Sequence, residues 1–419
     1  MPKRAVHARG CKANTADSFA IPFCALFLPS PGLRLAPASC RSMHWNVSTP
    51  QAPSPSLGGR SFLQALQPLA SDSCLHVGID ENGLGPVLGP LVVTGVAFRV
   101  NGPRPASLGT LVGDSKALVS HADFSLGEAW ARALLGALGT PPSSPGEIVS
   151  RLSLDDGPTL RAPCPPPTDQ PREQHAASMC WPAQPESFVA DDELVDRCAR
   201  IIRGWASTER LGGRFARKTP VELVGARAAI VCASRMNEAR AGGRHLFIVD
   251  LHAMERVALG LHGAFARAGE PIDAVCGKVG GMDYYSGYFG PLSSRLCAIE
   301  AEGGAASAYR FPGLGRLTFL RDGDATDPLV GLASLVGKYL RELLMGRVVR
   351  YMRAAVSGEG LENELPNASG YRDPATKKFI AATALVRAAR NRPDRCFDRR
   401  LTMNAHPPTP PAPDESTAR

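Results

Sequence analysis

The segment Val77–Pro90 constrains this chain more than any other. It reads VGIDENGLGPVLGP, in which an apolar run ends in two adjacent acids, Asp80 and Glu81, and a glycine-rich turn follows. Adjacent residues of a strand point to opposite faces, so one carboxylate can reach a metal ion while the other serves a second metal or the turn. The glycines let the backbone approach a phosphate or sugar and offer N–H donors. A strand that ends in solvated acids and a tight turn explains the spacing equally well.

The rest of the chain has the mixed periodicity of an α/β protein. Apolar and β-branched runs predict strands at 75–80, 91–100, 245–249, 272–276, 295–301, 308–311 and 317–320. Helical spacing predicts helices at 127–138, 191–205, 221–241, 252–268, 329–355 and 375–390.

Composition divides the chain into three regions. Residues 1–72 are rich in Pro, Ser and Ala and are expected to form a disordered basic extension. A folded domain is expected over 73–400, interrupted by a proline-rich insertion at about 140–187, and a disordered tail over 401–419. Residues 1–60 hold seven Lys and Arg against one acid, so most of the net charge of +8 lies there. A nucleic-acid partner must therefore be argued from local sites.

The cysteines and the hydropathy indicate a reduced, cytoplasmic chain without a membrane partner. The 11 cysteines occur singly and form no C-x-x-C pair. No run approaches the ~20 apolar residues of a membrane helix. The stretch Phe19–Leu28 imitates a signal peptide but contains a proline, so a disordered start is the favoured interpretation.

Three more segments carry candidate chemistry, and they follow the first in order. They read GDSKAL at 113–118, GDATDPLVGLASLVGK at 323–338 and ASGY at 368–371. In the segment 323–338, Asp324 precedes a helix that starts with Pro328, where the positive helix end keeps an acid ionised and able to bind metal. The plain alternative is that Asp324 only caps the helix.

Together the four segments resemble the signatures of the type 2 ribonucleases H, the ribonuclease HII family, over about Val77 to Tyr371. The first matches G-[IV]-D-E-x-G-R-G-P-x-x-G-P except that Leu84 replaces the arginine. The others are similar to D-S-K-K-L, to G-D-A-x-x-P-x-I-x-A-A-S-I-x-A-K without a gap, and to K-G-Y-x-T.

The resemblance implies a ribonuclease H-like α/β fold, with a mixed central sheet flanked by helices and a helical C-terminal part. It implies a monomeric endonuclease that hydrolyses the RNA strand of RNA–DNA hybrids, or ribonucleotides embedded in DNA, and leaves 5′-phosphate products. Asp80, Glu81 and Asp324 would be catalytic and would hold Mg²⁺ or Mn²⁺. The implied substrate-binding residues are Gly83, Leu84, Gly85, Lys116, Lys338 and Tyr371, of which the tyrosine and the turn backbone would detect the 2′-hydroxyl.

One acid of the family pattern is missing. The family has a further Asp at the end of a later strand, here 272–276, and a divergent bacterial branch reads D-K-x-G-G there, which places the lost carboxylate at Gly277. Asp273 or Asp283 would compensate only with a shift in geometry. Lys278 would either hold the scissile phosphate or repel metal. Two alternatives therefore stay open: a catalytically impaired hybrid-binding protein, and a scaffold without a nucleic-acid role.

Overall fold

The computed structural model describes residues 59–67, 69, 71, 73–100, 124–156, 181, 186–206, 221–356, 365–390 and 392–399. All of them lie in one compact unit, Gln51–Arg419. The strands are β1 (Cys74–Asn82), β2 (Leu91–Val100), β3 (Val221–Val231), β4 (Ile272–Gly277), β5 (Ala298–Ala301), β6 (Ala306–Phe311) and β7 (Gly315–Leu320). The helices are α1 (Gly59–Ala65), α4 (Ser125–Ala137), α5 (Pro145–Leu152), α7 (Asp192–Ala206), α8 (Ala233–Ala241), α9 (Leu246–Phe265), α10 (Gly323–Thr326), α11 (Pro328–Val356), α12 (Pro374–Ala382), α13 (Ala384–Ala389) and the 3₁₀ turn η5 (Asp394–Cys396).

The strands form one mixed sheet in the order β3-β2-β1-β4-β7-β6-β5. The first three strands are antiparallel neighbours, whereas β4 runs parallel to both β1 and β7. The carboxyl ends of β1, β4 and β7 therefore meet at one edge of the sheet, where ligands of such sheets commonly bind. The predicted α/β class, with a mixed sheet flanked by helices, is confirmed.

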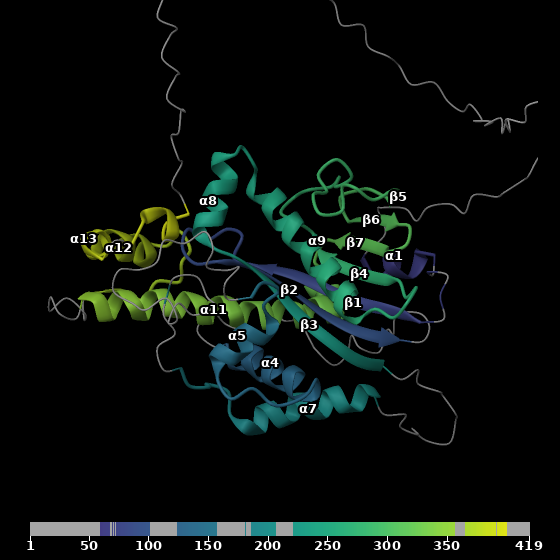
Figure 1. Cartoon of the computed structure of the whole chain (residues 1–419), viewed down its shortest axis with the longest axis horizontal. Helices are drawn as coiled ribbons and strands as arrows, with labels where there is room; N and C mark the ends of the chain where they lie inside the picture. The colour runs from purple at the N-terminus through teal and green to yellow at the C-terminus, as the bar shows by residue number, and fades with distance from the viewer. Residues whose placement is uncertain are drawn as a thin grey trace, which may run out of the picture. The chain divides into compact units, whose positions relative to one another are not determined.

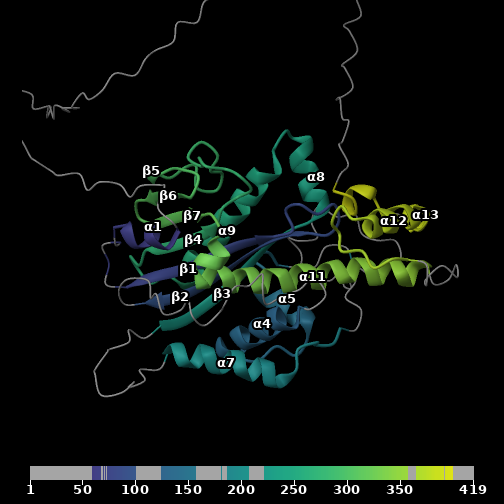
Figure 2. The same ribbon diagram turned by 180° about the vertical axis from the view of Figure 1, so that it is seen from behind.

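Helices cover both faces of the sheet, as the opposite views in Figures 1 and 2 show. Long helix α11 lies against β1 and β2, α4, α5 and α7 lie beside it against β3, and α9 lies on the other face (Figures 1 and 2). Alternate side chains of β2 explain the two layers, because Val92 and Val96 join the core under α11 while Leu91 and Val93 join the core under α9. Within the described part of the chain, no helix combines the length and apolar content needed to cross a bilayer.

Two predicted elements are wrong in kind. The helix predicted at 221–241 is strand β3 followed by α8, because its first half pairs with β2 along the sheet edge. The strand predicted at 245–249 is instead the first turn of α9, whose 20 residues place one long apolar face on the sheet. Short apolar runs do not distinguish buried strand from buried helix, and here pairing partners far along the chain decide.

Three predicted boundaries also change. The extension expected over 1–72 includes helix α1, whose Phe62 is fully buried against β4 and β7 residues. The insertion expected at 140–187 includes α5, which Ser144 caps by accepting a hydrogen bond from the Glu147 N–H. The last predicted helix is two helices, α12 and α13, which meet at Thr383. The predicted tail at 401–419 and the DSK segment lie outside the described residues.

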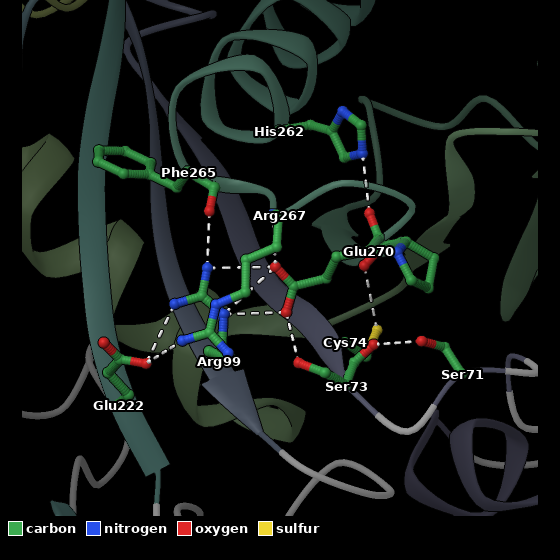
Figure 3. Close-up of polar contacts among 10 residues, drawn as sticks. Ser71, Ser73, Cys74, Arg99, Glu222, His262, Phe265, Arg267 and Glu270 are labelled. Atoms are coloured by element: carbon green, nitrogen blue, oxygen red, sulfur yellow. Dashed lines mark hydrogen bonds and ion pairs between the residues drawn. The ribbon is translucent and has the colours of Figure 1, made fainter.

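A buried ion-pair network, drawn in Figure 3, fastens the amino-terminal end of β1, remote from the acids. The Arg99 guanidinium donates to both Glu270 carboxylate oxygens, at 2.9 and 3.2 Å from Nε, and to the Phe265 carbonyl at 2.7 Å. Ser73 Oγ donates to the same carboxylate at 2.5 Å. The network ties β2 to the loop that joins α9 to β4, and so fixes the register of β4 beside β1.

Candidate active site

Strand pairing brings Asp80 beside Gly277. Because Ile79 is in register with Cys276, the next residues on the two parallel strands are Asp80 and Gly277. A Cβ at position 277 would lie 2.4 Å from Asp80 Oδ1 and 3.4 Å from Glu81 Oε2. A side chain at position 277 would therefore lie next to both carboxylates. The Asp80 carboxylate now fills the space that such a side chain would need. The assignment of the missing acid to Gly277 agrees with this geometry.

Close backbone contact between α11 and the sheet brings Asp324 to the same place. A Cβ at Gly78 would lie 2.1 Å from the Leu329 carbonyl carbon, so only glycine lets the start of α11 approach β1 this closely. Asp327 caps α11, because its Oδ1 accepts hydrogen bonds from the Leu329 and Val330 N–H groups at 3.0 and 3.2 Å. The capping role considered for Asp324 is thus filled by another residue, and Asp324 lies 8% exposed one short turn earlier.

The three predicted acids form one electrostatic group. Burial raises the pKa of the Asp80 carboxyl well above its ordinary value, and the Glu81 and Asp324 carboxylates raise it further, while a hydrogen bond with Ser334 lowers it. Mutual repulsion of this kind favours either a proton or a cation between the acids. Across the described ranges, however, no three His, Cys, Asp or Glu side chains are already arranged to hold a metal ion together.

The glycine-rich turn lies against the ASGY segment at 368–371. Val87 and Leu88 donate backbone hydrogen bonds to the Gly370 carbonyl at 2.7 and 3.0 Å. Tyr371, the next residue, is 37% exposed, and the Arg341 guanidinium lies 4.8 Å from its ring centroid. Gly83 has a φ of +93°, and a Cβ there would meet the Pro90 carbonyl oxygen at 2.6 Å, so the turn requires glycine. The tyrosine thus lies beside the turn expected to approach the ribose.

The two acids considered as substitutes for the missing one are already occupied. Asp273 is paired with Arg316 at 3.1 Å and lies 3.4 Å from His76 Nδ1, four residues before Gly277 on β4. Asp283 pairs with the Lys278 ammonium at 2.5 Å. That ammonium also donates to the carbonyls of 303 and 304 at 2.6 and 2.8 Å, so Lys278 holds a loop and neither predicted role fits it.

Sequence reasoning missed a further acid near Asp80, the buried Asp250 on α9. It is fully buried, and within the described residues neither carboxylate oxygen has a hydrogen-bond partner. Burial raises the pKa of Asp250 well above its ordinary value, and the Asp80 carboxylate raises it further. Since α9 and α11 cover opposite faces, Asp250 approaches the end of β1 from the face opposite to Ser334. A helical interpretation of 246–261 would have found it, because Asp250 shares a helix face with Met254, Val257 and Leu261.

The two predicted lysines have different outcomes. Lys338 is half-buried on α11, one turn beyond Ser334, and burial lowers the pKa of its ammonium. It therefore lies on the helix that contacts Asp80. Lys116 lies outside the described residues.

Comparison with known proteins gives likenesses to solved structures only. No protein-family model and no curated protein matches the chain. Ribonuclease HII of Archaeoglobus fulgidus, solved in complex with PCNA, is 16% identical, with 79% of this chain and 96% of that chain covered and a TM-score of 0.33.

Two further structures are similar at the same level. Bst-RNase HIII in complex with Mn²⁺ is 16% identical over 74% of this chain and 71% of that one, with a TM-score of 0.34. Ribonuclease H2 of Pyrococcus horikoshii OT3 is 11% identical over 74% and 98%, with a TM-score of 0.28. The fold itself rests on the order and direction of the strands. The chain has an α/β fold with a mixed seven-stranded sheet flanked by helices, and it resembles the type 2 ribonucleases H.

Proposed function

We propose that this chain is a metal-dependent endonuclease that cleaves the RNA strand of RNA–DNA hybrids, or DNA at embedded ribonucleotides. One observation carries the proposal: the adjacent acids Asp80 and Glu81 interact electrostatically with Asp324, which is far away in the sequence, at a single sheet edge. The turn that follows the first two acids contacts the Gly370–Tyr371 loop. Acids and ribose-facing groups are thereby adjacent, as hydrolysis next to a 2′-hydroxyl requires.

The donor set fits a hard divalent cation. Carboxylate oxygens are the ligands that Mg²⁺ and Mn²⁺ prefer, and Mg²⁺ is commonly bound by one or two carboxylates together with substrate phosphates. A site without a complete cage of protein ligands suits that mode. Asp80, Glu81 and Asp324 would hold the ion, which when bound polarises the scissile phosphate and supplies a nucleophile at neutral pH.

The chain's own residues position the substrate. The Gly83–Gly85 backbone faces the ribose, where Gly85 has open space around it and is exposed. Tyr371 offers one ring face for stacking, since Arg341 lies over its ring and more than a third of the side chain is exposed. Lys338 adds positive charge near the acids. Hydrogen bonds to the ribose from the backbone survive the change of arginine to Leu84.

A second candidate function is hybrid binding with impaired catalysis. It is favoured by Gly277, because the position expected to carry a carboxylate has none and the Asp80 carboxylate fills its place. The raised pKa of the Asp80 carboxyl also favours this second candidate, since a protonated Asp80 binds cations poorly. This candidate keeps the glycine-rich turn and the tyrosine but loses the arrangement needed for hydrolytic attack.

Three duplexes of one sequence distinguish the candidates: an RNA–DNA hybrid, a DNA with one ribonucleotide, and an all-DNA control. With Mg²⁺ or Mn²⁺ we expect slow cleavage of the first two only, giving 3′-hydroxyl and 5′-phosphate ends. The isosteric Asp80→Asn variant should remove cleavage and keep binding. Hybrid binding without cleavage would favour the second candidate, and equal affinity for all three duplexes without cleavage would contradict both.

A further inference from the structure

A cavity of about 530 Å³ opens beside the glycine-rich turn. One wall is the turn itself at 84–87, and another is the junction between α8 and α9 at 243–247. Its cationic lining residues are Arg240, Arg244, Arg372 and Arg399. No acid is among its described lining residues, so the cavity, which we call the arginine cavity, carries a concentrated positive charge.

Arg399 forms the floor of the arginine cavity. It is 1% exposed, and its guanidinium donates to the carbonyls of Gly83 and Leu84 at 2.7 and 2.8 Å. Its Nε has no hydrogen-bond partner among the described residues. Burial, together with the nearby Arg341 and Arg240 guanidiniums, lowers the pKa of Arg399 to about 9. The group is still a cation at neutral pH, and a buried cation without an acid partner is costly unless an anion approaches it.

Arg244 and Arg372 provide the exposed charge at this cavity. Both side chains are exposed, and within the described residues neither forms an ion pair. The amino-terminal end of the 20-residue helix α9 lies between the arginine-bearing segments, and its N–H groups and dipole favour an anion at the same place. Exposed guanidiniums above a buried one match the fork geometry with which arginine binds phosphate.

We infer that the arginine cavity binds a backbone phosphate of the duplex whose ribose lies at the Gly83–Gly85 turn, an inference that rests on the proposed function. The turn forms one wall of the cavity, so a strand that presents a ribose to its backbone carries the adjoining phosphate toward the arginines. Leu84 lacks the charge that an arginine would bring to this turn. The α8–α9 junction and the C-terminal segment supply that charge from elsewhere in the chain.

The test compares two double variants of the full chain in EDTA, where binding is measured without cleavage. Arg244→Gln/Arg372→Gln removes the exposed charges of the cavity, whereas Arg200→Gln/Arg203→Gln removes two exposed charges from α7 on the other side of the sheet. Both leave the buried Arg399 untouched, so folding should be preserved, as circular dichroism would verify. Affinity for hybrid and for all-DNA duplex is measured over a salt series, with inorganic phosphate as a competitor.

We expect the cavity variant to bind both duplexes roughly tenfold more weakly and to reduce the salt slope by about one to two. The ratio of hybrid to DNA affinity should stay unchanged, because phosphate contacts carry no sequence or sugar information. The α7 variant should bind like the wild type.

The outcomes separate this inference from the proposed function. Equal losses in both double variants would overturn the arginine cavity as a phosphate site, whatever the hybrid preference. Wild-type-like duplex binding by the cavity variant, with loss of inorganic phosphate binding alone, would overturn it in favour of a free anion. A wild type without hybrid preference, but with the expected loss in the cavity variant, would refute the proposed function and leave the cavity assignment standing.

Discussion

The buried network around Glu270 predicts a specific dependence of stability on pH (Figure 3). Burial alone would raise the pKa of Glu270, but hydrogen bonds from Arg99, Ser73 and the Arg267 N–H lower it from 4.5 to about 2. A folded pKa below the unfolded one means that the ionised carboxylate stabilises the fold. This stability is complete above about pH 4.5 and is lost as the pH falls through 2. At about 1.4 kcal/mol per pKa unit, the contribution at pH 7 is about 3 kcal/mol.

The Arg99→Met variant tests this value, because it leaves Glu270 buried without its main partner. We expect its free energy of unfolding at pH 7 to fall by about 3 to 5 kcal/mol, measured by urea denaturation followed by circular dichroism. The difference from wild type should shrink between pH 4.5 and 3. The double variant Arg99→Met/Glu270→Leu should be more stable than Arg99→Met alone. A difference that stays constant from pH 7 to 3, or one below about 1 kcal/mol, would refute the reasoning.

Three further predictions concern the site and the chain ends. Asp250 and Asp80 have raised pKa values, so they stabilise the fold most below about pH 4 and lose that contribution as the pH rises through their folded pKa values. The Asp250→Asn variant should therefore lose less stability than the wild type in thermal scans from pH 4 to 8, and an unchanged pH profile would contradict this prediction. Tyr371→Ala should reduce hybrid affinity on the order of tenfold while Tyr371→Phe retains it, measured by fluorescence anisotropy; equal affinities for the two would exclude stacking. Removing residues 1–58 should leave the free energy of unfolding unchanged, whereas removing residues 1–67 should lower it by about 3 to 5 kcal/mol, because the buried Phe62 is lost. Equal stability of the two truncated chains would contradict the packing of α1.

Local patterns predicted those parts of the site that depend on strand and helix ends. Asp80 and Glu81 end an apolar run and Asp324 precedes a proline-started helix, so their placement needed only local signals. Position 277 followed from the resemblance to the divergent branch of the family, aligned at the end of the predicted strand at 272–276, and the register with Asp80 agrees.

Other features depend on contacts between distant segments. Nothing local to 221–231 shows that it pairs with β2, and the apolar run at 246–249 is compatible with strand or helix. That ambiguity concealed Asp250, whose burial follows only once α9 covers the sheet. The arginine cavity draws its lining from four separated parts of the chain, so no single sequence window could reveal it.

Cleavage by Gly277→Asp tests the central claim most directly. Gly277 has no left-handed backbone angle, so a side chain is tolerated, but the Asp80 carboxylate must rotate away from the new Cβ. Gly277→Ala is the matched control, since it displaces Asp80 without adding a carboxylate. The measured quantity is the rate of cutting of a DNA duplex with one ribonucleotide, in Mg²⁺ and in Mn²⁺. We predict a faster rate for Gly277→Asp than for wild type, and no gain for Gly277→Ala. Equal rates for Gly277→Asp and Gly277→Ala, with both variants folded and still binding hybrid, would contradict the account.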